Sequence, residues 1–393
     1  MISLLGSTGT IGVKTLSLLS NTDLKIFALT AHTNKKLLAN QIIKYNPSYA
    51  VIKSKNDAEY LKQLCDKKKI STKILSGESG LTYVSSHKRV SHVLSAIVGA
   101  AALRPTFNAV KAGKKILLAN KESLVMSGSL MIRTAKKTGA IIVPIDSEHN
   151  AILQIITAHG STYNSKNNKY KDDIDHLYIT ASGGPFLNYS QSQLKRVTVS
   201  QAIKHPTWSM GKKISIDSAT MMNKGLEVIE ACILFNLKPS QINILIHPQS
   251  ILHAMVHFCD GSIISHMSAH DMRIAINYAL TWPERKSLKS NIKKLPLKEL
   301  FFRKTKKNEF KCLDLCIKAL KLGGSAPTIL NAANEVAVEN FLQNKIKFTD
   351  IPVIIDQALK NIKITKAQSI KSLLLCDEHT REYVKRYIDK KWK

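Results

Sequence analysis

Short apolar runs alternate with helix-like stretches over the first third of the chain. The runs cover residues 1–5, 24–29, 49–53, 92–98, 115–119 and 140–145. Consecutive apolar positions of this length are typical of parallel strands that are buried on both faces. Between the first two runs, residues 13–19 have the apolar spacing of a helix. The alternation therefore predicts an α/β domain built on a parallel sheet.

The pattern changes after residue 145. Further strand-like runs follow at 177–181, 242–246, 251–258 and 262–267, separated by polar helical stretches. Residues 282–308 carry many lysines and are interpreted as a linker, and residues 309–393 have helical periodicity throughout. We predict an N-terminal domain over 1–146, a second α/β domain over 147–281 and a C-terminal helical domain over 309–393.

A glycine turn joins the first predicted strand to the first predicted helix. It reads Gly6-Ser-Thr-Gly9-Thr-Ile-Gly12. Strand, glycine turn and helix in this order are typical of a Rossmann-like dinucleotide-binding domain, in which the pyrophosphate meets the helix N-terminus. The spacing is GxxGxxG and not the commoner GxGxxG, so a glycine turn without a ligand stays an alternative.

Composition narrows the class of protein. The chain has 393 residues, 44% of them hydrophobic, and a formal net charge of +30. Its basic residues occur in small groups along the whole sequence, which argues against nucleic-acid binding as the main function. No apolar run approaches the roughly 18–20 residues of a membrane span, so we expect no membrane partner. No signal peptide is recognised and the six cysteines form no zinc pattern, which together predict a cytoplasmic protein.

Two carboxylates follow the apolar run that ends at residue 145. Asp146 and Glu148 flank Ser147, and in an extended chain their side chains point to the same side. Such a pair makes half of an oxygen-ligand site for Mg²⁺ or Mn²⁺, with Glu227 as the obvious third ligand. A surface pair of acidic residues is the alternative.

Residues 217–227 concentrate short polar side chains beside two methionines and a glycine. Ser218, Asn223 and Lys224 suit a phosphate, since they offer a hydroxyl, an amide and a positive charge. Glu227 would repel that phosphate unless a divalent metal lay beside it. The alternative is a polar helix start that is capped by Asp217 or Ser218.

Three other segments carry candidate chemistry. Lys121 lies in Asn-Lys-Glu at the end of a predicted strand, and Ser182 opens a Ser-Gly-Gly-Pro turn whose amides could bind an anion. His205 and Trp208 share a predicted loop, where an indole is expected to cover a ligand. His247 and His253 are interpreted as structural.

These segments together resemble the 1-deoxy-D-xylulose 5-phosphate reductoisomerase family, whose enzymes use NADPH in the non-mevalonate isoprenoid route. The resemblance runs in family order through the whole chain. The motifs that carry it are Gly6–Gly12, residues 119–123, 144–149, 181–186, 205–211, 217–227, 247–250, 282–285 and 331–337.

The resemblance implies a fold, partners and a role for each matched position. The fold is a Rossmann-like N-terminal domain, an α/β catalytic and dimerisation domain with a mobile loop near 205–213, and a C-terminal α-helical bundle, in a homodimer that binds a sugar phosphate. Mg²⁺ or Mn²⁺ would be held by Asp146, Glu148 and Glu227. The catalytic set is Lys121, Asp146, Glu148, Glu227 and His205. The substrate-binding set is Lys121, Ser147, Glu148, Ser182, His205, Trp208, Ser218, Asn223, Lys224 and Glu227. The NADPH-binding set is Thr8, Gly9, Thr10, Ile11, Thr33, Asn34, Asn120, Glu122 and Gly211.

One segment departs from the family pattern. After the second strand the family often has Gly, then Lys, Arg or Ser, then Asn, whereas this chain has His32-Thr33-Asn34. Thr33 can donate a hydrogen bond to a 2′-phosphate but cannot neutralise it, and nearby Lys35 or Lys36 could compensate. Two other classes stay open on the residues alone: a semialdehyde-dehydrogenase-like oxidoreductase, which needs a cysteine at a strand end, and a basic nucleic-acid-binding protein.

Overall fold

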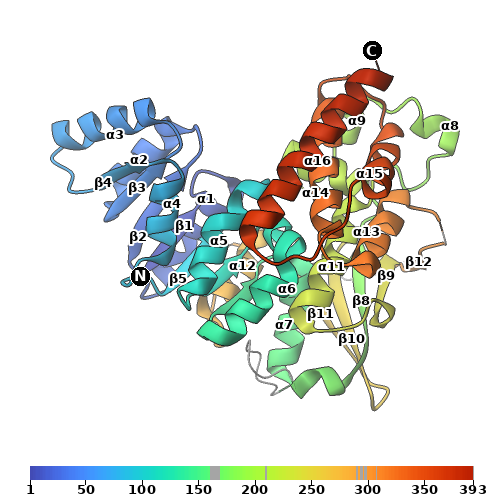
Figure 1. Cartoon of the computed structure of the whole chain (residues 1–393). Helices are drawn as coiled ribbons and strands as arrows, with labels where there is room; N and C mark the ends of the chain where they lie inside the picture. The colour runs from blue at the N-terminus through green and yellow to red at the C-terminus, as the bar shows by residue number, and fades with distance from the viewer. Residues whose placement is uncertain are drawn as a thin grey trace.

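A computed structural model describes residues 1–159, 169–208, 210–288, 291–292, 295, 299–306 and 308–392. Figure 1 shows an N-terminal lobe on the left, a middle region, and C-terminal helices at the upper right. The chain is mixed α/β with two sheets, as the sequence predicts.

The first sheet is parallel and has the strand order β4-β3-β2-β1-β5-β6-β7. Its strands are β1 (Ile2–Leu5), β2 (Ile26–Ala31), β3 (Tyr49–Ile52), β4 (Lys73–Ser76), β5 (His92–Ser95), β6 (Lys115–Leu118) and β7 (Ile141–Pro144). The chain moves outward from β1 in one direction and then returns to add β5 on its other side. A ligand crevice is expected at this reversal, outside the carboxyl ends of the strands.

Helices cover this sheet and connect its strands (Figure 1). They are α1 (Thr10–Leu18), α2 (Lys35–Tyr45), α3 (Lys55–Lys67), α4 (Gly77–Ser86), α5 (Leu103–Lys111) and α6 (Lys121–Thr138). Two glycines of the Gly6–Gly12 motif, one before α1 and one in its first turn, are needed for close packing. A Cβ at Gly6, whose φ is +91°, would lie 2.6 Å from the carbonyl oxygen of Ala96, and a Cβ at Gly12 would lie 2.3 Å from that of Gly6.

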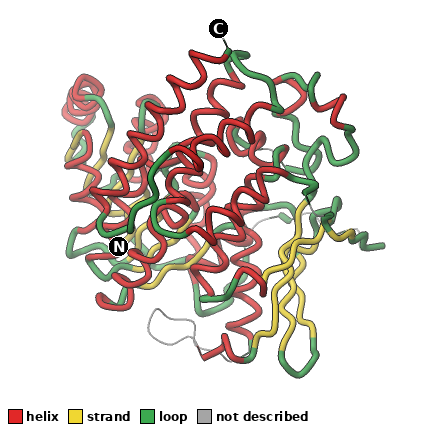
Figure 2. The backbone as a smooth tube through the Cα atoms, turned by 45° about the vertical axis from the view of Figure 1, so that its right-hand side comes forward, coloured by secondary structure: helices red, strands yellow, loops and turns green. Residues whose placement is uncertain are grey.

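The second sheet has the order β11-β10-β8-β9-β12. Its strands are β8 (Ile174–Ala181), β9 (Ile242–Ile246), β10 (Leu252–Phe258), β11 (Ile263–Met267) and β12 (Arg303–Lys304). Figure 2 shows the long strands of this sheet side by side at the lower right. Part of the expected linker, 282–308, is thus strand β12, which pairs with β9. Its two residues are both charged, so this strand gives no apolar signal in the sequence.

The remaining helices surround this sheet, form the C-terminal bundle or, for residues 272–281, pack against α1 (Figures 1 and 2). They are α7 (Ser147–Ala158), α8 (Gln191–Leu194), α9 (Val199–Ala202), α10 (Lys212–Ala219), α11 (Met222–Phe235), α12 (Met272–Thr281), α13 (Lys311–Leu322), α14 (Ala326–Leu342), α15 (Asp350–Asn361) and α16 (Ile370–Lys391). Helix α11 joins the lobes, since it packs against both α6 and α13. Gly128 on α6 permits the close approach of α6 to α11, because a Cβ at this position would lie 2.3 Å from Cδ1 of Ile233 on α11.

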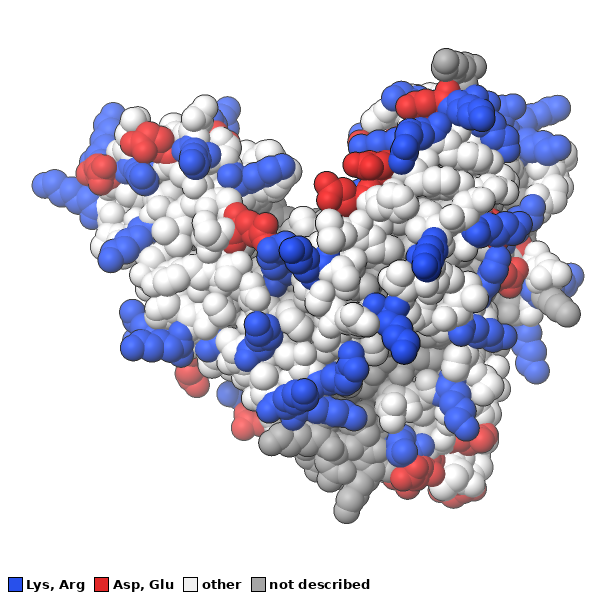
Figure 3. All heavy atoms as spheres, viewed as in Figure 1, with Lys and Arg blue, Asp and Glu red and all other residues white. Residues whose placement is uncertain are grey.

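The basic residues spread over the surface. Figure 3 shows Lys and Arg scattered across the whole visible face, with no single patch that gathers them. In the part of the chain that the structure describes, no helix is both long and apolar enough to cross a membrane.

Candidate functional site

A cavity of about 510 Å³ opens where the glycine turn, the carboxyl ends of the central strands and helix α11 meet. Seventeen of the site residues predicted from the sequence line it: Gly9, Thr10, Ile11, Asn120, Lys121, Glu122, Asp146, Ser147, Glu148, Ser182, His205, Trp208, Gly211, Ser218, Asn223, Lys224 and Glu227. Thr8, Thr33 and Asn34 do not line this cavity. Asn34 instead caps α2, accepting a hydrogen bond from the Leu37 amide at 3.1 Å.

Strand β6 and strand β7 each deliver a charged side chain at the sheet edge. Asn120 caps α6, so that Lys121 begins that helix, and Asp146 stands at the cap position of α7. The extended Asp-x-Glu arrangement expected from the sequence is therefore wrong, because Glu148 lies in the first turn of α7. Both carboxylates still reach the cavity, since the helix begins directly at the strand end.

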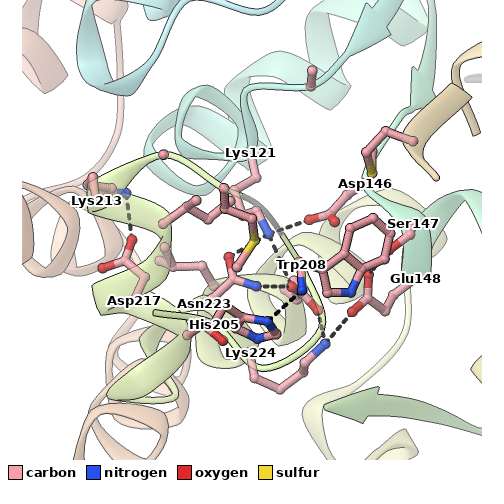
Figure 4. Close-up of a pocket in the computed structure, with 18 of the residues that line it drawn as sticks. Lys121, Asp146, Ser147, Glu148, His205, Trp208, Lys213, Asp217, Asn223 and Lys224 are labelled. Carbon is pink, nitrogen blue, oxygen red and sulfur yellow. Dashed lines mark hydrogen bonds and ion pairs between the residues drawn. The ribbon is translucent and has the colours of Figure 1, made fainter. Parts of the chain in front are cut away.

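The 217–227 segment is not a capped helix start. Asp217 and Ser218 lie in the last turn of α10, and Met221, with φ of +61°, turns the chain into α11 without a side-chain cap. This sharp reversal places Asn223, Lys224 and Glu227 on one side of α11, where Asn223 and Lys224 both contact Glu227. Figure 4 shows Asn223 and Lys224 pointing into the cavity.

Acidic and basic groups alternate at the centre of the site (Figure 4). Carboxylate oxygens of Asp146, Glu148 and Glu227 all lie within 4.8 Å of one another. Lys121 forms ion pairs with Asp146 and with Glu227, whose Oε1 is 3.2 Å from Nζ. Lys224 lies 2.7 Å from Oε1 of Glu148 and also contacts Glu227. The two ammonium groups thus occupy the space between three carboxylates.

Burial and neighbouring charges set the protonation of these groups. Burial raises the pKa of Glu227 to about 7, with Glu148 adding to the shift while Lys121 and Lys224 oppose it. Burial alone would lower the pKa of Lys121, but Asp146 and Glu227 outweigh it and raise that pKa well above its usual value. For Glu148 burial is outweighed by Lys224, so its pKa is lowered.

The donor set fits a hard divalent cation. Three carboxylates offer the oxygen ligands that Mg²⁺ and Mn²⁺ prefer. Glu227 is fully buried, and the buried Oδ2 of Asp146 is balanced by an ion pair with Lys121. A divalent ion there would compensate charge that the two lysines now balance.

Two buried residues behind this cluster were not foreseen. His149 is fully buried, with Nε2 at 2.9 Å from the carbonyl oxygen of Glu227 and Nδ1 at 3.3 Å from Oε2 of Glu230. Burial raises the pKa of Glu230 to about 7. Glu230 follows Glu227 by one helical turn, so the spacing of the two glutamates was the available signal.

The predicted loop covers one side of the cavity. Nδ1 of His205 accepts a hydrogen bond from the Trp208 amide at 3.0 Å, so that Nε2 is assigned the proton that it donates to Oγ of Ser182, 3.0 Å away. Burial lowers the pKa of His205 to about 4, with a smaller contribution from His270. Within the predicted loop, 205–213, Ser209 lies outside the described residues.

A chain of ion pairs links the cavity to the C-terminal helices. Lys213 lies 2.7 Å from Oε1 of Glu122 and 2.8 Å from Oδ2 of Asp217, and Asp217 accepts a hydrogen bond from Asn334 at 2.8 Å. The sequence did not reveal Lys213, because Lys212-Lys213 looks like a surface pair. His253 also lines the cavity at 4% exposure, although the sequence suggested a structural role.

No cysteine is among the residues that line the described cavity. A semialdehyde-dehydrogenase-like site, which needs a cysteine at its centre, therefore finds no support in this geometry.

Models of known protein families match almost the whole chain. Residues 2–128 match 1-deoxy-D-xylulose 5-phosphate reductoisomerase, residues 142–235 match the C-terminal domain of that enzyme, and residues 267–383 match a further DXP reductoisomerase C-terminal domain.

Individual proteins give the same result. The chain is 45% identical to the 1-deoxy-D-xylulose 5-phosphate reductoisomerase of Acinetobacter baumannii (strain SDF), covering 100% of this chain and 98% of that protein. It is also 45% identical to the Pseudomonas aeruginosa (strain UCBPP-PA14) enzyme over 97% and 96% of the two chains. A solved DOX-P reductoisomerase in complex with NADPH, fosmidomycin and magnesium superposes with a TM-score of 0.92. The two sequences are 41% identical, and the match covers 100% of this chain and 99% of that chain. The Zymomonas mobilis 1-deoxy-D-xylulose 5-phosphate reductoisomerase in complex with NADPH superposes with a TM-score of 0.89 at 36% identity, and the match covers 98% of each chain.

Proposed function

Because the chain belongs to the 1-deoxy-D-xylulose 5-phosphate reductoisomerase family, we propose that the cavity described above is the place where it carries out that reaction. The chain is an NADPH-dependent oxidoreductase that converts 1-deoxy-D-xylulose 5-phosphate into 2-C-methyl-D-erythritol 4-phosphate in isoprenoid biosynthesis. The observation that carries the site assignment is the convergence of three carboxylates and two lysines beside the glycine turn.

The metal would be held by Asp146, Glu148 and Glu227. A divalent ion bound there supplies positive charge to the oxygens of the substrate while negative charge develops on them. Two solved relatives are complexes with magnesium, and we propose that manganese also serves here, since its ligand preference is similar.

The chain's own groups position the substrate. Lys121 and Ser147 lie beside the carboxylates, where they can contact the hydroxyls and carbonyl that react. Ser182, Ser218, Asn223 and Lys224 would hold the phosphate, although Asn223 and Lys224 here contact Glu227 itself. Binding energy at the phosphate, remote from the reacting carbons, orients the substrate.

The loop would exclude water during the reaction. His205 is held by Ser182 and by the Trp208 amide, so the loop is tied to the proposed phosphate turn. Closure of Trp208 over the substrate would strengthen every electrostatic contact inside the site.

NADPH supplies the hydride when bound. The amides of Thr10 and Ile11 at the start of α1 suit its pyrophosphate. The proposed set also contains Thr8, Gly9, Thr33, Asn34, Asn120, Glu122 and Gly211. Lys35 forms an ion pair with Asp57 at 2.7 Å, whereas Lys36 is exposed. Lys36 is therefore the lysine that we propose for the 2′-phosphate. Lys36→Ala should raise KM for NADPH and leave the KM for NADH unchanged.

We also propose the division of the chain at 146, 281 and 308, a homodimer, and a cytoplasmic location. In the described part of the chain β11 is an edge strand with Ile263 54% and Ile264 39% exposed, which supports pairing with a second copy there. The six cysteines are free, which suits a reducing compartment. Light scattering on the purified chain tests the dimer.

The assignment is tested by following NADPH absorbance. Purified protein with Mg²⁺ or Mn²⁺ should oxidise NADPH only when 1-deoxy-D-xylulose 5-phosphate is added, and fosmidomycin should inhibit that oxidation. Folded, metal-loaded protein that shows no substrate-dependent loss of NADPH would contradict the proposed function.

A further inference from the structure

A second group of metal-ligating side chains lies on the sheet β11-β10-β8-β9-β12, apart from the cavity. His176 on β8 and His257 on β10 face each other across the antiparallel pair, and Asp175 precedes His176. Their strand neighbours Leu177 and Val256 are fully buried. Because side chains alternate along a strand, the two histidines lie on the opposite, accessible face. None of the three lines the catalytic cavity.

The three side chains converge on one point. Nδ1 of His176 is 2.7 Å from Oδ2 of Asp175, and Nδ1 of His257 is 3.3 Å from the same oxygen. All three ligand atoms lie within 4.8 Å of one another. Bonds of about 2.0–2.2 Å to a tetrahedral ion place neighbouring ligand atoms roughly 3.3 Å apart, so only small side-chain shifts are needed.

Neighbouring contacts hold the ligands in this arrangement. The two imidazole rings stack with centroids 4.4 Å apart, and Tyr178 packs edge-on against His176 at 4.9 Å. The carbonyl oxygen of Asp175 accepts a hydrogen bond from Gln241 at 3.1 Å. The histidines are 21% and 24% exposed and Asp175 is 58% exposed, so an ion can enter from solvent.

An ordinary ion pair leaves this cluster incomplete. Nδ1 of His257 is buried and has no hydrogen-bond partner among the described residues, although it points toward Asp175. Protonating both stacked rings to pair with one carboxylate would place two like charges in contact. A cation between the three groups instead uses both ring nitrogens and the carboxylate together.

We propose that Asp175, His176 and His257 form a surface site for a transition-metal ion of the zinc class, which ties β8 to β10. Two imidazole nitrogens and one carboxylate are a ligand set for Zn²⁺, with water in the fourth position. The set differs from the all-carboxylate site of the cavity, which suits Mg²⁺. Binding here would stabilise the sheet and would not enter the reaction.

The test is calorimetric titration of the full chain with ZnCl₂ in excess Mg²⁺. The wild type should bind one more Zn²⁺ per chain than His176→Gln/His257→Gln. His379→Gln, which removes an exposed histidine on α16, is the matched control and should bind as the wild type does. Zn²⁺ should also raise the unfolding temperature of the wild type more than that of the double variant.

Asp175→Asn provides an independent variant, since it keeps both histidines and the side-chain size. We expect it to weaken the additional Zn²⁺ binding event at least tenfold. An unchanged number of bound ions in the double variant, or unchanged affinity in Asp175→Asn, would overturn the proposal. If the double variant does not fold, Asp175→Asn decides alone.

Discussion

Lys213 offers a sharp test of how the three regions of the chain are held together. Its ammonium group lies between Glu122 on α6 and Asp217 on α10, and Asp217 also accepts a hydrogen bond from Asn334 on α14. The side chain of Asp217 is only 2% exposed. Lys213→Met therefore leaves a buried carboxylate with one neutral hydrogen-bond partner.

The magnitude follows from the burial of the two partners. Removing one partner of a buried ion pair costs about 3–5 kcal/mol, and since Lys213 itself is 22% exposed we expect about 3 kcal/mol. For a chain of 393 residues that corresponds to a fall in Tm of roughly 4 °C. Lys213→Met/Asp217→Asn should recover at least about 1 kcal/mol, because the stranded charge is gone.

Thermal unfolding of the four proteins in this double-mutant cycle measures the coupling. Lys212→Met is the matched control, since Lys212 is the adjacent exposed lysine, and its Tm should not change. The reasoning is refuted if Lys213→Met unfolds at the wild-type temperature, or if the double variant is no more stable than Lys213→Met.

The other predictions concern packing, substrate binding and pH. Gly128→Ala should destabilise the protein by about 1–3 kcal/mol because its Cβ meets Ile233, and Gly128→Ala/Ile233→Ala should recover part of that loss in thermal unfolding. Asn223→Ala should raise KM for the sugar phosphate about tenfold, the value of one hydrogen bond to a charged group, in steady-state kinetics; an unchanged KM would contradict the phosphate role. Burial, then Lys115 and the N-terminus, lower the pKa of His92 to about 4, so its neutral form contributes stability that is lost as pH falls from about 6.5 to 4. His92→Gln should lessen that loss in a series of Tm measurements across this pH window. If Tm falls with pH as steeply in His92→Gln as in the wild type, the lowered pKa of His92 is contradicted.

The strands of the first sheet could be predicted because they are buried on both faces and therefore read as continuous apolar runs. Strand β4 was missed, since only Ile74 and Leu75 are apolar in it, and β12 was missed because both of its residues are charged. The position of Glu227 beside Asp146 and Glu148 was predicted from a chemical conflict within one segment.

Tertiary contacts account for what the sequence did not reveal. Lys213 and Asp217 lie four residues apart on α10, a spacing that the sequence does show, whereas Glu122 reaches Lys213 from α6 and no spacing along the chain encodes that contact. The extended geometry expected for Asp146 and Glu148 is wrong for a local reason. Aspartate before a helical run is a cap signal, which favours a helix start over an extended strand end.

The central claim is that Glu227 completes a metal site on which the reaction depends. Glu227→Gln keeps the side-chain size, and Glu59→Gln, at a glutamate that is 60% exposed, is the matched control. Measured as NADPH oxidation at saturating Mg²⁺ and 1-deoxy-D-xylulose 5-phosphate, Glu227→Gln should lose at least about 100-fold in rate while Glu59→Gln retains the wild-type rate. A folded Glu227→Gln protein that keeps more than half of the wild-type rate would contradict the account.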